Sequence, residues 1–158
     1  MILGITGHRP DKLGGYHIPN PTYTRVCREI EKVFQDLKPE KVITGMALGV
    51  DQWAAFIAYK LNIPFLAAVP FEGQEKKWPS KSQDLYNKLL KKATEIVIVS
   101  PGGYESSKMK TRNRWMVDYS DKMLAVWDGS SGGTGNCINY ATSVEKEIIR
   151  IDPRLTNP

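Results

Sequence analysis

Short apolar runs alternate along this chain with longer segments of helical periodicity, and this alternation constrains the fold more than any other feature. The short runs are rich in aliphatic and β-branched residues, whereas apolar residues recur at three- and four-residue spacings between them. We predict five strands at residues 2–6, 41–44, 64–70, 95–100 and 122–127. The predicted helices span residues 21–37, 47–61, 82–93, 112–120 and 136–150.

The predicted strands are nearly continuous apolar runs, so both of their faces should be covered. Strand–helix repeats of this kind form a parallel sheet with helices packed against it. The 158 residues match one ordinary domain, and 41% hydrophobic residues suffice for its core. The sequence therefore predicts an α/β fold: a single Rossmann-like domain at residues 1–150, with a mostly parallel five-stranded sheet, helices on both faces, and a tail at residues 151–158.

Composition and charge exclude several classes of protein. No apolar run approaches the roughly 20 residues of a membrane span, and no basic residue precedes the apolar N-terminal run as in a signal peptide. We therefore expect a cytoplasmic protein without a membrane partner. Cys27 and Cys137 lie far apart without paired spacing, so neither a disulfide framework nor a zinc site is indicated, and no metal or cofactor is predicted.

The net charge of +5 is spread along the chain without a long basic run. This charge suits an anionic small molecule, and nucleic acid is the less favoured partner. Assembly into a homo-oligomer is left open by the sequence.

The candidate site residues lie in loops that follow the predicted strands. In an open parallel sheet, such loops converge on a crevice where ligands bind. The loop after the first strand contains Gly7, His8 and Arg9. Glycine lets the backbone approach a ligand, and the forked donors of Arg9 suit a phosphate. An ordinary surface loop is the alternative, and a single histidine such as His8 is as often a packing group as an acid or base.

The loop after the second strand contributes Gly45, Ala47, Gly49 and Asp51. These residues open a helix, whose unpaired N–H groups could hold an anion. Neither the three-glycine dinucleotide fingerprint nor a Walker loop is present. Asp51 could bind a ribose, or it could simply stabilise the helix dipole.

Gly132, Gly133 and Thr134, after the fifth strand, give the strongest single signal, because a flexible backbone, donors and a helix start together form a phosphate cradle. A flexible linker is the alternative. The segment 101–115 is predicted to be a mobile lid, in which Arg112 and Asn113 contact an anionic ligand while Lys108 and Lys110 face solvent.

Two carboxylates after strands are candidate catalytic residues. Glu72 follows the third strand and Asp128 follows the fifth. A carboxylate there could stabilise positive charge on a ribose carbon or activate water. Glu72 could instead hydrogen-bond backbone, and nearby Trp78 could stack on a base or pack at the rim.

Four segments resemble the SLOG superfamily, the Rossmann-like group that includes DNA-processing protein A and the LONELY GUY nucleotide hydrolases. They are residues 5–10 (ITGHRP), 44–55 (TGMALGVDQWAA), 112–118 (RNRWMVD), and 126–129 (VWDG) followed by Gly132, Gly133 and Thr134. The second is similar to the Gly-x-Ala-x-Gly-x-Asp motif of the DNA-processing relatives, and the last to the glycine-rich phosphate loop of the hydrolases. The combination looks most like the YspA/YpsA-like branch.

The resemblance implies a nucleotide or nucleotide-derived ligand, with its phosphate on Gly132, Gly133 and Thr134 and its sugar or base near Gly7, Gly45 and Asp51. The catalytic glutamate that follows the hydrolases' loop is missing, because Asn136 and Cys137 occupy this part of the chain.

Three functions follow as hypotheses. The first is an enzyme that hydrolyses the N-glycosidic bond of a nucleoside 5′-monophosphate. The second is a non-catalytic protein that senses or sequesters a nucleotide signal. Single-stranded DNA binding is the least favoured of the three.

Overall fold

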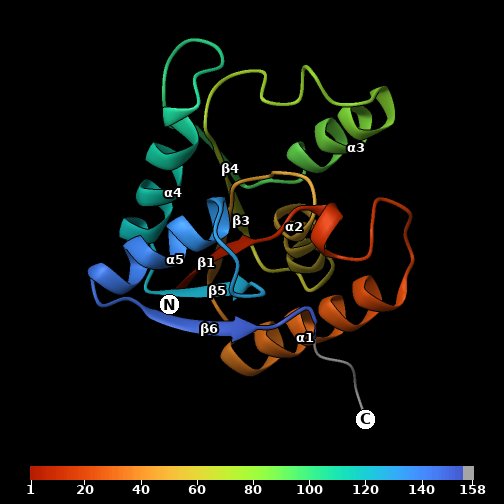
Figure 1. Ribbon diagram of the computed structural model, residues 1–158, viewed down its shortest axis with the longest axis vertical. Coiled ribbons are helices and arrows are strands. Elements are labelled where there is room, and N and C mark those ends of the chain that lie inside the picture. The colour runs from red at the N-terminus through yellow and green to blue at the C-terminus, as the bar shows by residue number, and fades with distance from the viewer. Residues whose placement is uncertain (155–158) are drawn as a thin grey trace.

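Six parallel strands form one sheet in the order β4-β3-β2-β1-β5-β6 in the computed structural model, which describes residues 1–154 (Figure 1). The strands are β1 (Ile2–Gly7), β2 (Lys41–Thr44), β3 (Phe65–Val69), β4 (Glu95–Ile98), β5 (Lys122–Val126) and β6 (Glu147–Ile151). Every neighbouring pair runs parallel, and β1 pairs with β5 from Leu3↔Lys122 to Gly7↔Val126. The carboxyl ends of all strands therefore lie at one edge of the sheet.

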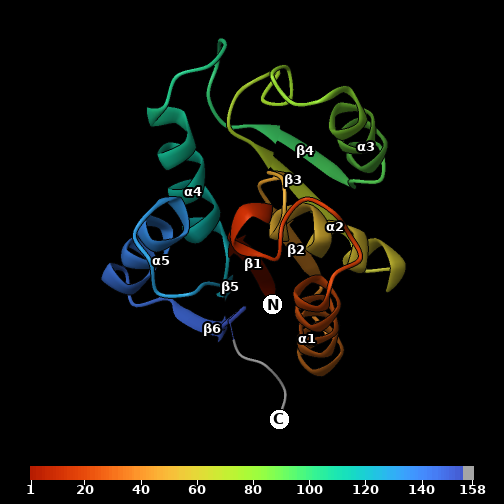
Figure 2. The same cartoon turned by 45° about the vertical axis from the view of Figure 1, so that its right-hand side comes forward.

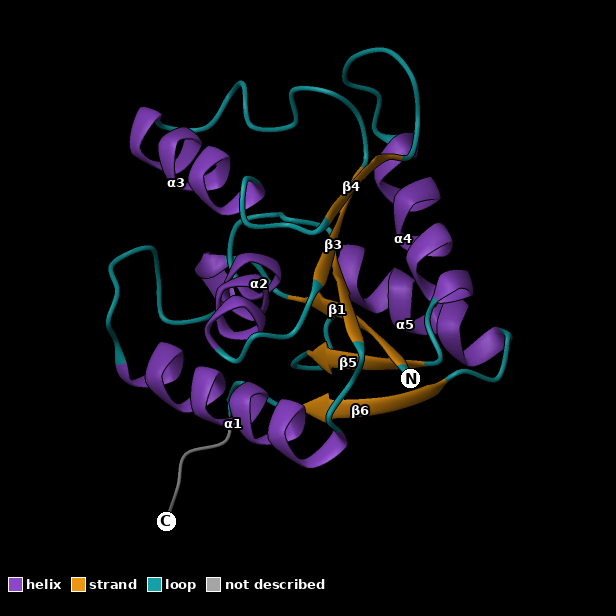
Figure 3. Cartoon of the chain, turned by 180° about the vertical axis from the view of Figure 1, so that it is seen from behind, coloured by secondary structure: helices purple, strands orange, loops and turns teal. Residues whose placement is uncertain are grey.

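The helices cover both faces of this sheet, as the view from behind shows (Figure 3). Helices α1 (Pro21–Leu37), α2 (Val50–Lys60) and α3 (Ser80–Leu90) lie on one side, and α4 (Ser107–Tyr119) and α5 (Gly133–Ser143) on the other. A short 3-10 helix, η1 (Pro10–Lys12), lies between β1 and α1 (Figure 2). The α/β class, the parallel sheet and the single Rossmann-like domain are thus confirmed.

The predicted number of five strands is wrong, because the chain forms a sixth after α5. The predicted helix 136–150 ends at Ser143, and Glu145 adopts a positive φ of 59° that turns the chain back toward the sheet. Residues 147–151 then pair with β5. Three β-branched isoleucines in five residues favour a strand here. A helical periodicity and a short strand are hard to separate in so short an apolar run.

The predicted lid 101–115 is also wrong over its second half. Helix α4 begins at Ser107, so the loop after β4 is shorter, and Arg112 lies in the second turn rather than at the helix start. Lys108 and Lys110 are helical residues. The polar composition of this segment concealed its helical character.

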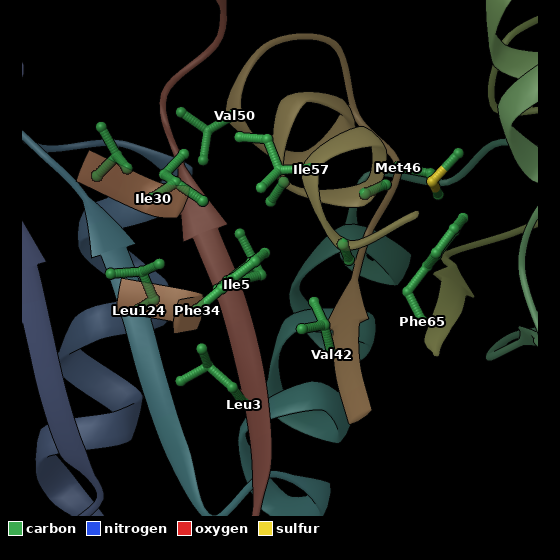
Figure 4. Close-up of a cluster of buried hydrophobic side chains, with 14 of the residues drawn as sticks. Leu3, Ile5, Ile30, Phe34, Val42, Met46, Val50, Ile57, Phe65 and Leu124 are labelled. Atoms are coloured by element: carbon green, nitrogen blue, oxygen red, sulfur yellow. The ribbon is translucent and has the colours of Figure 1, made fainter. Parts of the chain in front are cut away.

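The core lies between the sheet and each helical layer. Leu3, Ile5 and Leu124 of the strands pack in one cluster with Ile30 and Phe34 of α1 (Figure 4). On the opposite face, Ile43 and Leu66 pack with Met116 of α4. Full burial of such a side chain contributes about 1.5–3 kcal/mol. Both faces of the central strands are thus buried, which explains their continuous apolar sequences.

Helix α1 begins at the predicted residue. The Asn20 side-chain oxygen accepts a hydrogen bond from the Tyr23 backbone N–H at 2.9 Å, and Pro21 occupies the first helical position. The cap holds the end of the long loop that leaves β1.

No helix within residues 1–154 is long and apolar enough to span a bilayer. The compartment and the domain boundary at residue 150 stay predictions, and residues 155–158 of the predicted tail lie outside the described part of the chain.

Candidate ligand-binding site

A pocket of about 280 Å³ opens between the loops that follow β1 and β5, bounded also by the β2–α2 loop and α4. The strand order reverses here, since β2, β3 and β4 extend the sheet to one side of β1 while β5 and β6 extend it to the other. This reversal is the place where open parallel sheets bind ligands. We call this hollow the switch-point pocket.

Ten of the twelve predicted ligand-binding residues line the switch-point pocket: Gly7, His8, Arg9, Ala47, Asp51, Arg112, Asn113, Gly132, Gly133 and Thr134. They come from four separate segments of the chain. The position of a loop after a parallel strand thus indicated eight of these residues, whereas Arg112 and Asn113 lie within helix α4.

The other two, Gly45 and Gly49, lie behind the pocket wall. A Cβ at Gly45 would collide with Arg112 Nη1 and lie 2.9 Å from Asp51 Oδ2. Gly49 has a φ of 96°, and a Cβ there would lie 2.6 Å from the His8 carbonyl oxygen. These glycines therefore allow the pocket-lining segments to pack closely.

Arg112 provides a buried cation in the pocket wall. Its side chain is only 4% exposed, and Nη1 donates to the carbonyl oxygens of Gly45 at 2.8 Å and Ala68 at 3.1 Å. Nε donates to Asn113 Oδ1 at 2.9 Å. Nη2 makes no hydrogen bond to any residue in the described chain. Burial lowers the pKa of Arg112, an effect that the nearby Asp51 opposes.

Asp51 places a buried carboxylate in the same pocket. It lies in the first turn of α2, and Oδ2 accepts a hydrogen bond from Ala47 N at 3.2 Å, whereas Oδ1 has no partner among residues 1–154. Burial raises the pKa of Asp51 to about 6, against the opposing effects of Arg112, the Ala47 N–H and Arg9. Asp51 forms no ion pair within the described residues, so both it and Arg112 keep an unpaired polar atom.

The N-terminus of α5 adds a concentration of backbone donors. Gly132 precedes the helix with a φ of 140° and provides no side-chain cap, and Gly133 and Thr134 occupy the first turn. The first N–H groups of a helix lack partners within it and carry partial positive charge, which favours anions. Lys12 and Arg9 line the same pocket from the loop after β1.

The Asp128 side chain stabilises the loop between β5 and α5. Its Oδ1 accepts a hydrogen bond from Ser130 N at 2.9 Å and lies 2.9 Å from His8 Nε2, while its own N–H donates to that nitrogen at 3.0 Å. The hydrogen bonds from Ser130, together with His8, hold the pKa of Asp128 well below its usual range. The side chain lies beside the switch-point pocket rather than in its wall.

Glu72 lies outside the switch-point pocket, on an exposed part of the β3–α3 loop. It lines a second pocket of about 600 Å³, which we call the aromatic pocket because Phe71, Trp78 and Tyr104 contribute to its wall. The catalytic roles of Glu72 and Asp128 stay predictions, with neither carboxylate in the wall of the switch-point pocket.

Met109 and Lys12 line the switch-point pocket but were not selected from the sequence. Met109, Arg112, Asn113 and Met116 recur at helical spacing, and recognition of an earlier start for α4 would have placed all four on one face. Lys12 lies three residues after Arg9 in the same basic loop. Within the part of the chain that the structure describes, no three metal-ligating side chains gather at a single point.

The parallel sheet and the pocket at its reversal define the class of molecule: a Rossmann-like α/β protein with a crevice at the switch point. The chain belongs to the YspA SLOG family, whose model matches residues 3–152. The resemblance to the SLOG superfamily is thereby confirmed.

Two relatives indicate how far the similarity extends along the chain. The uncharacterized SPbeta prophage-derived protein YoqJ of Bacillus subtilis strain 168 is 33% identical, and the match covers 85% of this chain and 91% of YoqJ. A UPF0398 protein of Bacillus thuringiensis strain Al Hakam is 27% identical and covers 93% of this chain and 85% of its own length.

Solved structures share the fold at low identity. DNA processing protein A from Streptococcus pneumoniae superimposes with a TM-score of 0.71 at 16% identity, over 95% of this chain and 50% of its own, so the present chain spans half of that protein. A DNA processing protein A from Helicobacter pylori, described for its single-stranded DNA binding mode, has a TM-score of 0.69 at 17% identity. The match covers 98% of this chain and 66% of that protein. The molybdenum cofactor binding protein of Rippkaea orientalis has a TM-score of 0.60 at 17% identity, and the match covers 94% of this chain and 74% of that protein.

Proposed function

We propose that this protein binds a phosphate-bearing, nucleotide-derived small molecule in the switch-point pocket and acts as a sensor or sequestering protein for it. The observation that carries the proposal is Arg112, a buried guanidinium whose Nη2 has no partner in the described chain although the residue lines the pocket. A buried charge is costly unless it is paired. An anionic group of the ligand would provide that pairing.

The phosphate is assigned to the N-terminus of α5. Gly132, Gly133 and Thr134 offer backbone donors there, and Thr134 adds a hydroxyl. Arg9 and Lys12 contribute positive charge from the facing loop. Three cationic side chains outnumber the two carboxylates of the pocket wall, Asp11 and Asp51, and together with the helix N-terminus they favour an anionic group such as a phosphate monoester.

The sugar or base is assigned to the inner part of the pocket. Asp51 Oδ1 has no hydrogen-bond partner in the described chain and belongs to a residue of the pocket wall, and ribose hydroxyls are donors that would satisfy it. The volume of about 280 Å³ is close to the lower end of ligand pockets, which span about 300–1,000 Å³. One mononucleotide unit, rather than a larger molecule, is the ligand that suits this space.

Hydrolysis of the N-glycosidic bond is the second candidate function. Its support is the pKa of Asp51, raised to about 6 by burial, since a carboxyl that titrates near neutrality suits acid–base catalysis. In that reaction the carboxylate would take a proton from the attacking water as its oxygen bonds to C1′ of the ribose, and the base would leave with the electron pair of the C1′–N bond and take up a proton from solvent. Binding without turnover is favoured, because Asp128 is engaged by Ser130 and Glu72 lies in another pocket.

The structural relatives bear on the ligand only in general terms. Two of them are named for binding single-stranded DNA or the molybdenum cofactor, so this fold occurs in proteins that bind nucleotide-like ligands. Single-stranded DNA binding remains the least favoured function for this chain, since its sequence has no long basic run.

Calorimetric titration with the common ribo- and deoxyribonucleoside 5′-monophosphates tests the proposal. We expect at least one to bind wild-type protein, and Thr134→Glu to weaken that binding at least about tenfold, because its carboxylate repels the phosphate. A glutamate in the first turn favours the helix, so this variant should fold. Ser80→Glu, at the exposed first residue of α3, is the matched control and should bind normally. Absence of binding by every monophosphate, or equal binding by Thr134→Glu, would refute the proposal.

A further inference from the structure

The aromatic pocket adjoins the switch-point pocket, and the residues at the junction are Arg9 and Met109, which line both. Arg9 is exposed and Met109 is half-buried in the first turn of α4. The two hollows therefore open on either side of one cationic side chain. A ligand that occupies both would pass Arg9.

The aromatic pocket carries the side chains that recognise a nucleobase. Tyr104 is 70% exposed although it contacts Phe71 edge-to-face with a centroid distance of 5.7 Å. Trp78 packs edge-to-face on Tyr86 at 5.3 Å, which orients its ring at the pocket wall. Aromatic side chains bind bases through stacking, largely independently of base identity.

Charge in the aromatic pocket favours an anionic ligand. Lys76, Lys77 and Arg9 line it against a single acidic residue, Glu72. Lys77 Nζ also lies 5.8 Å from the centroid of the Tyr104 ring. The pocket thus combines an exposed aromatic ring with cationic side chains in its wall, as expected where a base and an adjacent phosphate bind together.

Gln74 provides a fixed polar group in the same wall. Its Nε2 donates to the Gly45 carbonyl oxygen at 3.1 Å and to the Tyr86 hydroxyl at 3.3 Å. Its Oε1 is buried and has no hydrogen-bond partner. Gln74 is 8% exposed and lines the aromatic pocket. These hydrogen bonds hold the Gln74 side chain in place as a fixed part of the pocket wall.

We propose that the aromatic pocket is a second nucleoside subsite, so that the natural ligand is a small dinucleotide whose two nucleosides are joined through phosphate beside Arg9. The second base stacks on Tyr104, with Lys77 beside the same ring. This inference rests on the proposed function, because the first nucleotide unit occupies the switch-point pocket.

The test compares nucleoside 5′-monophosphates with dinucleotides in which two such units share a 5′–5′ or 3′–5′ phosphate linkage, titrated calorimetrically into the full chain. We expect at least one dinucleotide to bind about tenfold or more tightly than its monophosphate. Tyr104→Ala should remove this gain and leave the monophosphate affinity unchanged, and Tyr104→Phe should retain the gain. Tyr16→Ala, which also removes an exposed tyrosine, is the matched control and should change neither affinity.

The possible outcomes separate the two proposals. Equal affinity for monophosphates and dinucleotides, or a gain that survives in Tyr104→Ala, overturns the second subsite and leaves the proposed function standing. Absence of binding by all monophosphates and dinucleotides overturns both. An affinity for single-stranded oligonucleotides that keeps rising beyond two residues overturns the small-molecule assignment, since a nucleic-acid strand would then be the occupant.

Discussion

Arg112 and Gln74 donate hydrogen bonds to the same carbonyl oxygen, that of Gly45, although they line different pockets. The distances are 2.8 Å from Arg112 Nη1 and 3.1 Å from Gln74 Nε2. One peptide group of the β2–α2 loop thus fixes a polar side chain in each half of the candidate site. A substitution at residue 45 should therefore displace polar side chains in both pockets.

Substitution of Gly45 tests this arrangement. In Gly45→Ala the new methyl group would collide with Arg112 Nη1, which cannot move away without breaking its hydrogen bonds. We expect a loss of about 1–3 kcal/mol in the free energy of unfolding, as for other overpacked cores. Urea denaturation followed by circular dichroism measures it. Gly103→Ala is the control, since no atom lies within 4 Å of its added Cβ. Equal stability of the two variants would contradict the packing described.

The stability of the protein should depend on pH through Asp51. Burial raises its pKa to about 6 in the folded protein, whereas an aspartate in an unfolded chain titrates near about 3.9. The folded state therefore holds the proton more tightly. The stabilisation that comes from this tighter proton binding by Asp51 is fully present below about pH 4 and is lost as the pH rises to about 6 and above. Between these limits we expect wild type to lose up to about 3 kcal/mol relative to Asp51→Asn, which does not titrate.

Urea unfolding of both proteins at pH 4, 5, 6 and 7 gives this difference directly. Asp36→Asn removes a carboxylate from an exposed position on α1 and is the control. Its stability should follow the wild-type profile throughout. Parallel profiles for wild type and Asp51→Asn would show that the Asp51 carboxyl titrates normally.

The fold was largely predictable because its signals are local. Continuous apolar runs identified five of the six strands, and the Asn20–Pro21 pair located the start of α1. The sixth strand was not predicted because Ile148 and Ile149, in so short a run, are compatible with a helix or a strand. The pairing of these residues with β5 makes them a strand. The start of α4 was not predicted because its first turn is polar except for Met109, and the buried residues of the helix are Arg112, Met116 and Val117.

The site was predictable to the level of loops but not of atoms. Position after a parallel strand indicated Arg9, Asp51 and Thr134 without any knowledge of their contacts. Whether a carboxylate faces a ligand depends on its neighbours in space. Asp128 meets His8, which is 120 residues distant in the chain, and Glu72 lies in a different pocket. No sequence spacing records those relations.

Asp128 should contribute to stability through the loop that it fixes. In Asp128→Ala the Ser130 N–H loses its carboxylate acceptor and His8 loses a neighbouring charge. We expect the free energy of unfolding at pH 7 to fall by about 1.5–3 kcal/mol, the range for hydrogen bonds to charged groups. Thermal or urea denaturation would reveal this loss. Asp36→Ala should change the free energy of unfolding little. Comparable losses in Asp128→Ala and Asp36→Ala would argue against the structural role of Asp128.

If the protein releases base from any nucleotide, Asp51 rather than Glu72 should be required. A general acid or base must reach the reacting atoms, and Asp51 lines the pocket to which the nucleotide is assigned, whereas Glu72 lines the neighbouring one. Asp51→Asn should then lower the rate of release at least about 100-fold, and Glu72→Gln should leave it within about twofold. Liquid chromatography with mass spectrometry detects the free base after incubation with each nucleotide.

A rate abolished by Glu72→Gln but retained in Asp51→Asn would move the reaction to the exposed loop after β3, in agreement with the hypothesis drawn from the sequence. If neither the variants nor the wild type release base although a nucleotide binds, the protein recognises its ligand without altering it. That last outcome is the one we expect, because Asp51 is the only carboxylate among the described residues that is both buried and in the pocket wall, so the second buried carboxyl that glycosidic-bond hydrolysis ordinarily uses is not placed beside it.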